Sequence, residues 1–220
     1  MDTLECIKTR RSIRKFTTAP IPRKDLEELI EIARWSPSYK NSQPWQAIIL
    51  SGDKKQGLSK MLVGLLNDEK EASPDLTAPT SWPEAEQKNI KHLLAKRMEL
   101  TGVDLGTPEM IFKAKKTNFN FYFAPHAIYL FQDASLSDWS LFDIGLFAQN
   151  LMLAAHAKGL ATVPQAFATD YAKEVKEFLG IPADKRLILG LSVGYPDMES
   201  PINAYRTERM APEEFSTWME

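Results

Sequence analysis

Positive charge is concentrated in one short segment near the N-terminus of the chain. Residues 8–15 contain five of the lysines and arginines of a 220-residue sequence whose formal net charge is −2 at pH 7. The guanidinium groups of Arg10, Arg11 and Arg14, the Ser12 hydroxyl and free backbone N–H groups match the oxygens of a phosphate monoester. A solvated basic turn is the alternative. A nucleic-acid surface has less support, because no second basic run with interleaved aromatic residues accompanies this one.

A second segment, residues 36–45, is rich in hydroxyl and amide groups. It joins a predicted helix to a predicted strand and has prolines near both ends. Stiff prolines hold polar donors and acceptors in a fixed geometry, which suits recognition of a heteroaromatic ring edge or a polyol chain. Taken alone, the composition favours an ordinary turn with capping residues. The candidate ligand-binding residues here are Pro37, Ser38, Tyr39, Asn41 and Gln43.

Two further polar segments follow predicted strands. Segment 163–166, with the sequence Val-Pro-Gln-Ala, leaves a short buried strand, and segment 203–209 follows the last strand of the chain. Arg206 and Arg209 lie in a tail with little to bury, so they fit a second contact to a phosphate. Ordinary surface arginines would give the same pattern.

Several classes of site lack the residues they need. The three histidines are scattered, and none lies at metal-ligand spacing from another or from the single cysteine, so we expect no metal site. The chain has no Gly-x-Ser-x-Gly elbow, no Walker loop and no Gly-x-Gly-x-x-Gly after a strand. We therefore expect that a bound cofactor, and no catalytic side chain, carries the chemistry.

Composition favours a protein of the cytoplasm. Hydrophobic residues make up 44% of the chain and the pI is near 6.0, so overall charge gives no reason to expect nucleic acid or a membrane surface. The longest apolar stretches are too short to span a bilayer, and the acidic N-terminus does not resemble a secretory signal. Cys6 cannot form an internal disulfide, which fits a reducing compartment.

The hydrophobic pattern predicts helices and strands in irregular alternation, typical of an α/β or α+β class, without fixing the strand order. A single domain is expected over 1–220, with a helical insertion or lid at about 67–118 and a C-terminal arm at about 196–220. Helices are predicted at 23–36, 141–158 and 170–179, and buried strands at 46–51, 126–132, 160–163 and 187–193. The 141–158 helix is apolar most of the way round, so it must be covered in the core or in a subunit interface.

Together, and in this order, the four segments resemble the FMN-dependent nitroreductase family. Residues 10–14 are similar to its Arg-(Arg/His)-Ser-x-(Arg/Lys) signature, and residues 37–45 closely resemble its Pro-Ser-x-x-Asn-x-Gln-Pro-Trp loop. Residues 194–196 (Gly-Tyr-Pro) and 203–209 resemble its tail motif. About 50 residues, 67–118, carry no recognisable part of the resemblance. Each motif is modest singly, and the ordered set is specific.

The resemblance implies an α+β fold, built as an intertwined homodimer with FMN at each end of the interface. Ser38 and Asn41 would reach the flavin from the partner subunit. Pro164 to Ala166 would pass beside the isoalloxazine ring and offer a backbone N–H near N5. Some relatives have an acidic residue and a glycine where this chain has Gln165 and Ala166. The cofactor-binding residues implied by the resemblance are Arg10, Arg11, Ser12, Arg14, Pro37, Ser38, Tyr39, Asn41, Gln43, Val163, Pro164, Gln165, Ala166, Arg206 and Arg209.

The activity implied is hydride transfer from NAD(P)H, through flavin N5, to a small electron-poor acceptor such as a nitroaromatic or a quinone. Donor and acceptor would use one pocket in turn. The 67–118 insertion and Phe121, Tyr122 and Phe123 are expected to wall it, although core packing would also explain these aromatic residues. Relatives that perform reductive dehalogenation, ene reduction or flavin breakdown share the arginine signature. A non-catalytic module that binds polyanions through residues 8–15 is the alternative from a different class.

Overall fold

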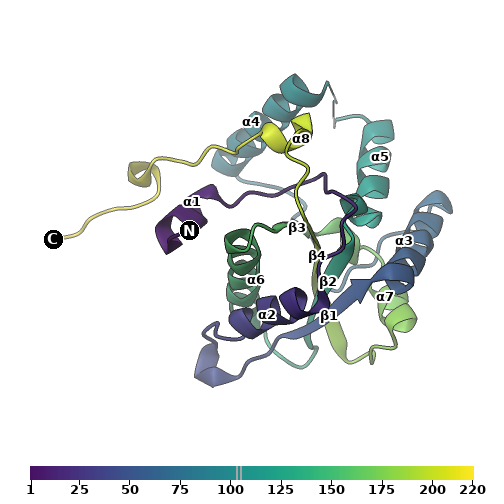
Figure 1. Ribbon diagram of the computed structural model, residues 1–220. Coiled ribbons are helices and arrows are strands. Elements are labelled where there is room, and N and C mark those ends of the chain that lie inside the picture. The colour runs from purple at the N-terminus through teal and green to yellow at the C-terminus, as the bar shows by residue number, and fades with distance from the viewer. Residues whose placement is uncertain (103, 105) are drawn as a thin grey trace.

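A four-stranded antiparallel sheet forms the centre of the molecule (Figure 1). The computed structural model describes residues 1–102, 104 and 106–220. The strands lie in the order β1 (Gln46–Ser51), β2 (His126–Asp133), β4 (Lys185–Gly194) and β3 (Ala161–Gln165). With helices on both faces of an antiparallel sheet, the predicted α+β class is confirmed.

Alternate residues of β2 enter two separate hydrophobic cores, one on each face of the sheet. Ile128 and Leu130 pack on one face, and Tyr129 and Phe131 pack on the other. This follows from the two-residue period of a strand, and a strand buried on both faces is apolar throughout. The prediction that 46–51 is a buried strand is wrong for most of its length, because β1 is an edge strand whose side chains are largely exposed or half-buried.

Two helices cover the first face of the sheet. Helix α2 (Arg23–Ala33) packs against α6 (Ser140–Ala157), and Leu29 and Leu151 lie fully buried between them and the strands. Helix α6 ends as predicted at Gly159, whose φ of +75° is left-handed, and the N–H of Leu160 donates to the carbonyl of Ala155.

The second face is covered by α3 (Gly52–Asn67), α5 (Pro108–Phe119) and α7 (Ala172–Leu179). The sequence pattern did not predict α3, which begins directly after β1 with a glycine at positive φ. The described residues also form short 3-10 helices in the loops and the tail, at Tyr39–Asn41, Phe121–Phe123, Phe167–Thr169 and Pro212–Glu214.

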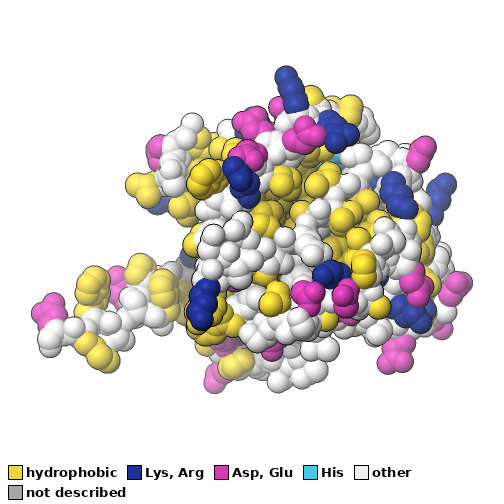
Figure 2. All heavy atoms as spheres, turned by 90° about the horizontal axis from the view of Figure 1, so that it is seen from below, with side chains coloured by type: hydrophobic (Ala, Val, Ile, Leu, Met, Phe, Trp, Pro, Cys, Tyr) yellow, Lys and Arg dark blue, Asp and Glu magenta, His cyan; other side chains and the backbone are white. Residues whose placement is uncertain are grey.

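The ends of the chain and α4 surround one corner of the sheet. Helix α1 (Thr3–Thr9), α4 (Glu84–Thr101) and α8 (Pro201–Ala204) lie near the start of β3, and the final residues extend away from the body (Figure 1). Figure 2 shows the same C-terminal arm standing clear, with hydrophobic side chains along it. In the described ranges, no helix is both long and apolar enough to cross a membrane.

Candidate cofactor site

The basic N-terminal segment lies alongside the edge strand β3. Ser12 forms an isolated parallel bridge with Thr162, and the N–H of Ile13 donates to the carbonyl of Thr162 over 3.1 Å. Ile13 and Val163 are buried together in a small hydrophobic cluster that fixes this pairing. The pairing brings the first predicted site segment, residues 10–14, beside the third, residues 163–166.

Asn203 joins the C-terminal tail to the same segment. Its side-chain oxygen accepts from the N–H of Arg14, and its amide donates to the carbonyls of Lys15 and Asp197, each over 2.8 Å. Asn203 is buried, so these three bonds replace its contacts with water. They bring Arg206 over the end of α1, where its guanidinium donates to the carbonyl of Lys8 over 2.6 Å.

A cavity of about 370 Å³ opens between α1, the end of α6, the start of β3 and the tail. Three guanidinium groups, those of Arg10, Arg11 and Arg206, line it, together with the hydroxyl-bearing Thr9 and Thr162. Neither Asp nor Glu is present among the described residues that line this cavity. This lining is suited to an anionic group.

The hydrogen bonding of the Arg10 side chain indicates what kind of ligand this cavity binds. Its Nη1 atom is buried and has no hydrogen-bond partner in the described part of the chain. Burial, and then the nearby Arg209 guanidinium, lower the pKa of Arg10. A buried cationic donor of this kind costs free energy until an acceptor satisfies it. The residues present thus fit the phosphate group of FMN.

Arg14 does not line the cavity that Arg10 lines. Together with Arg97 of α4, it lines a small hollow that does not include Arg10. The Arg97 guanidinium is half-buried, and burial followed by the charge of Arg14 lowers its pKa. Arg97 carries no sequence signal of its own, because it lies in the 67–118 segment, where no motif is recognisable.

The loop before β1 is held against the opposite end of α6. The N–H of Tyr39 donates to Oδ1 of Asp143 over 3.1 Å, and the N–H of Gln43 donates to the Ser38 hydroxyl over 3.0 Å. Lys40, Asn41 and Gln43 have φ values of 51°, 56° and 48°, which non-glycine residues adopt only when the surroundings enforce them. Of the predicted binding residues here, Ser38 is half-buried, and Pro37, Tyr39, Asn41 and Gln43 are exposed.

A single chain does not bring this loop to the arginine cavity. Asp143 beside the loop and His156 beside the cavity are separated by 13 positions of one helix, or about 20 Å at 1.5 Å per residue. The Oδ2 atom of Asp143 is buried without a partner in the described residues, so this end of α6 also has an unsatisfied polar group.

Only some residues of segment 163–166 are exposed at the surface. Pro164 and Ala166 are exposed, whereas Val163 and Gln165 are buried. The Gln165 amide donates to both the carbonyl and Oδ1 of Asn118 over 2.8 Å, and its oxygen accepts from Ser192 over 2.5 Å. Both side chains face the interior, so the contact that the resemblance implies for Val163 and Gln165, through the backbone of this segment, stays a prediction.

The aromatic turn before β2 is also divided between core and surface. Phe121 is fully buried against Tyr129, so it does not line a pocket, and that expectation is corrected. Tyr122 is half-buried, its hydroxyl accepts from the Asn118 amide over 3.0 Å, and Phe123 is 60% exposed. All three aromatic residues of the turn have φ between 51° and 60°.

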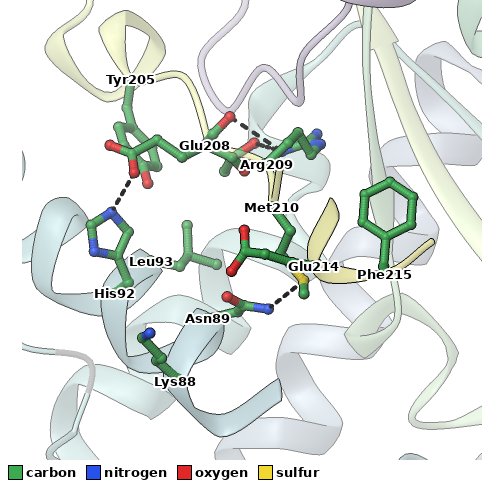
Figure 3. Close-up of a pocket in the computed structure, with 11 residues that line it drawn as sticks. Lys88, Asn89, His92, Leu93, Tyr205, Glu208, Arg209, Met210, Glu214 and Phe215 are labelled. Atoms are coloured by element: carbon green, nitrogen blue, oxygen red, sulfur yellow. Dashed lines mark hydrogen bonds and ion pairs between the residues drawn. The ribbon is translucent and has the colours of Figure 1, made fainter. Parts of the chain in front are cut away.

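A second, larger cavity of about 690 Å³ lies between α4 and the tail (Figure 3). Arg209 lines this cavity and not the first, and its guanidinium donates to the Thr207 hydroxyl over 2.5 Å. On the opposite wall His92 contacts Glu208 over 3.2 Å. Arg206 is therefore the tail arginine that the structure places at the first cavity.

Several residues of the site carried no signal that the sequence analysis could use. His156, Asp143 and Asn118 take part through the packing of α6 and α5, and a long helical pattern does not show which of its polar residues face a cavity. Among the described residues, no cluster of His, Cys, Asp and Glu is able to hold a metal ion.

Comparison with known proteins places the chain in a family. The family model described as the nitroreductase family matches residues 7–195. The chain is 32% identical over 213 residues to a 4-nitrobenzoate reductase of Pseudomonas putida, covering 97% of this chain and 93% of the relative.

Two solved structures share the whole fold. The FMN-dependent nitroreductase NfnB from Mycobacterium smegmatis, in complex with NADPH, has a TM-score of 0.93 at 28% identity, covering 99% of this chain and 97% of that chain. The FMN and NADPH-dependent nitroreductase NfnB from sphigopyxis sp. strain HMH has a TM-score of 0.94 at 26% identity, covering 100% of both chains. The chain belongs to the nitroreductase family.

Proposed function

We propose that this protein is an FMN-dependent oxidoreductase that reduces an electron-poor acceptor, such as a nitroaromatic compound or a quinone, with electrons from NAD(P)H. The observation that carries the proposal is the arginine-lined cavity in which Nη1 of Arg10 is buried without a partner. For a nitroaromatic acceptor the first balanced step is Ar–NO₂ + NAD(P)H + H⁺ → Ar–NO + NAD(P)⁺ + H₂O.

The chain's own residues would hold the phosphate at one end of FMN. Arg10, Arg11 and Arg206 provide charge-assisted donors around the cavity, and the Ser12 segment fixes their position on β3. Arg14, with Arg97 behind it, is a cation on the side of α4. Pro164 and Ala166, the exposed residues after β3, would border the isoalloxazine ring.

When bound, FMN supplies the hydride-accepting and electron-donating chemistry at N5. The protein's part is to orient the reactants, to exclude water and to present cations toward the edge of the ring that becomes anionic on reduction. Arg14 and Arg97, two half-buried cations beside α4, would be available for this role. No side-chain acid or base is required in this scheme. Because donor and acceptor would occupy one pocket in turn, the kinetics are expected to be ping-pong.

We also infer that the working form is a homodimer. In the single chain α6 keeps an exposed apolar face, with Phe142 68% and Leu146 45% exposed, at the end where Oδ2 of Asp143 has no partner. Burial of such a face is favourable, and a second copy would supply it. A partner would also bring its own Ser38 and Asn41 toward this chain's cavity, which a single chain does not do.

The acceptor class is proposed from the relatives and from the exposed aromatic residues. The half-buried Tyr122, which packs on the cluster that contains Val163 of β3, and the exposed Phe123 are suited to stack on a flat ring. A relative described as a 4-nitrobenzoate reductase makes nitroaromatic compounds the acceptors to test first, and solved relatives described with NADPH make NADPH the first donor. A reducing compartment, such as the cytoplasm, fits the lone buried thiol of Cys6.

The proposal is tested by the absorbance spectrum of the purified protein, recorded before and after NADPH or NADH is added without oxygen. We expect flavin bands that bleach with nucleotide and return when 4-nitrobenzoate or a quinone is added. Bleaching that no nitroaromatic or quinone reverses would shift the reaction to another chemistry of flavin. Absence of flavin, even after incubation with excess FMN, would overturn the proposal.

A further inference from the structure

His156 lies in the last turn of α6 and lines the arginine cavity, although it belongs to none of the four sequence segments. We propose that His156 is an additional phosphate-binding residue, which takes up a proton when the phosphate of FMN enters the cavity. This inference rests on the proposed binding of FMN. His156 would then increase the affinity of the protein for FMN relative to riboflavin, which lacks the phosphate.

The hydrogen bonds of Thr9 determine which ring nitrogen of His156 carries the proton. The Thr9 hydroxyl lies 2.7 Å from the carbonyl of Glu5, which only accepts, so the hydroxyl proton is used there. Nε2 of His156 lies 2.8 Å from the same hydroxyl oxygen and must therefore donate to it. Neutral His156 is thus the Nε2–H tautomer, and Nδ1 is the nitrogen that is free to take a second proton.

The charges that face His156 are mostly positive. Burial, then Arg10 and Arg11 of the adjoining segment, lower the pKa of His156, and Glu5 of α1 opposes them. Arg206 of the tail lines the same cavity and acts in the same direction as the other two arginines. Neutral His156 is therefore favoured while these cations lack a counter-ion.

Binding of a phosphate dianion among these arginines reverses the preference for the neutral form of His156. It adds negative charge to the cavity, and the C-terminal end of α6 also favours a cation at this position. The pKa of His156 then rises on binding, so FMN binding takes up a proton. By linkage, the contribution of His156 to FMN affinity is full below the pKa of the free protein and is lost as pH rises through the higher pKa of the complex.

The test compares dissociation constants of FMN and riboflavin for the flavin-free protein, measured by flavin fluorescence between about pH 6 and pH 8.5, on either side of the usual histidine pKa. The variant is His156→Gln, whose amide can still donate to Thr9 but does not titrate. The control is His92→Gln, the same change at an exposed histidine in the second cavity. Because the sequence has three histidines, ring-proton NMR can also follow His156 directly.

At the acid end of this range, His156→Gln is expected to reduce the preference for FMN over riboflavin by up to about tenfold, the limit set by a one-unit pKa rise on binding. Near pH 8.5 the change is expected to stay within about twofold, and His92→Gln is expected to match the unmodified protein throughout. FMN, but not riboflavin, should raise the pKa of His156 in the NMR titration.

A loss of preference that is equal at both pH values, or no loss at either, would overturn the role of His156 while leaving FMN binding intact. If the unmodified protein bound no FMN at any pH, the proposed function itself would fail. The two failures are therefore distinguishable.

Discussion

Among the arginines of the candidate site, Arg10 is distinguished by what surrounds it. Arg206 has a carbonyl partner, and the guanidinium of Arg209 bonds to its own neighbours along the tail. Nη1 of Arg10 is buried, has no partner in the described chain and faces other cations. Buried donors without a partner are few in native folds, and a bound anion is the explanation that fits the position of Arg10 beside the arginine cavity.

Replacement of Arg10 is therefore expected to act on cofactor binding. Arg10→Ala should weaken FMN binding by about 30-fold, since a hydrogen bond to a charged group contributes roughly 2 kcal/mol. Riboflavin, which lacks the phosphate, should lose much less. Flavin fluorescence titration measures both, and Arg23→Ala, which alters an exposed ion pair with Glu27, is the control. Equal losses for FMN and riboflavin would contradict a phosphate contact.

Replacement of Gln165 is expected to lower the stability of the fold, and not the affinity for cofactor, because its side chain faces the interior. Gln165→Ala leaves the carbonyl and Oδ1 of buried Asn118 without their donor. We expect a loss of about 2–3 kcal/mol in the free energy of unfolding, the usual cost of unsatisfied buried groups. Urea denaturation of the flavin-free protein at fixed concentration measures it. The exposed Gln56→Ala is the control and should change little. A stable variant with impaired nitroreduction would instead place Gln165 at the reaction centre.

At the scale of elements, one histidine joins three parts of the chain. Nε2 of His126, at the start of β2, accepts from the N–H of Ile21 over 2.9 Å, and Nδ1 lies 2.6 Å from the hydroxyl of Ser51, the last residue of β1. A ring that accepts at Nε2 and is not charged must carry its proton on Nδ1. The junction between α2, β1 and β2 thus depends on a neutral histidine.

This junction predicts part of the acid sensitivity of the fold. Burial, and then the charge of Lys55, lower the pKa of His126 in the folded state. The unfolded chain therefore binds the proton more readily, and the contribution of His126 to stability, full above its unfolded pKa of about 6.5, is lost as pH falls below that value. His126→Gln, which can still accept and donate, should weaken the fall in stability between about pH 7 and pH 5. Urea denaturation at both pH values tests this, with His92→Gln as the control. An unchanged pH profile would exclude His126 as its source.

The sequence predicted the elements that carry strong local signals. The helix ends at Gly159 and Gly180 were visible because a glycine follows an apolar repeat, and both adopt positive φ. Helices α1 and α3 were not predicted. Helix α3 begins without the usual capping side chain. Helix α1 begins at an N-cap, Asp2, but its seven residues are too few to show a helical repeat. The edge position of β1 depends on strand order, which periodicity does not determine.

The candidate site was predictable in outline for a related reason. Motifs identify residues such as Arg10 and Arg206 by type and spacing, and the structure brings these two to one cavity. Whether a side chain faces inward depends on tertiary packing. Val163, Gln165 and Phe121 were therefore included with the exposed members of their segments, and Arg97 and His156 were missed.

At the scale of the whole molecule, the exposed face of α6 predicts the state of assembly. Leu146→Arg puts a charge in the middle of that face and should shift the protein from dimer to monomer, because an unpaired charge is costly to bury. Light scattering coupled to size-exclusion chromatography measures the mass. Ile111→Arg on α5 is a matched control, since Ile111 is 43% exposed and Leu146 45%. A Leu146→Arg protein that remained dimeric would remove this face from the interface.

The same variant connects assembly with the cofactor. If Ser38 and Asn41 of one copy complete the site of the other, Leu146→Arg should lose FMN and dimer together. A monomer that still bound FMN with unchanged affinity would show that the loop before β1 takes no part in binding.

The C-terminal arm has a spectroscopic consequence. The sequence contains five tryptophans, and one of them, Trp218 in the arm, is 90% exposed in the single chain. Indole emission moves to shorter wavelengths when the ring leaves water. If the arm docks on a second copy, the emission of Trp218 should therefore shift to shorter wavelengths. Dilution of the unlabelled protein should then red-shift the emission. Comparison with Trp218→Phe separates the share of the arm from that of Trp139, which contacts Phe142 on the exposed face of α6. An arm that docks in this way would allow the dissociation constant of the assembly to be measured from the emission shift as a function of protein concentration, without a label.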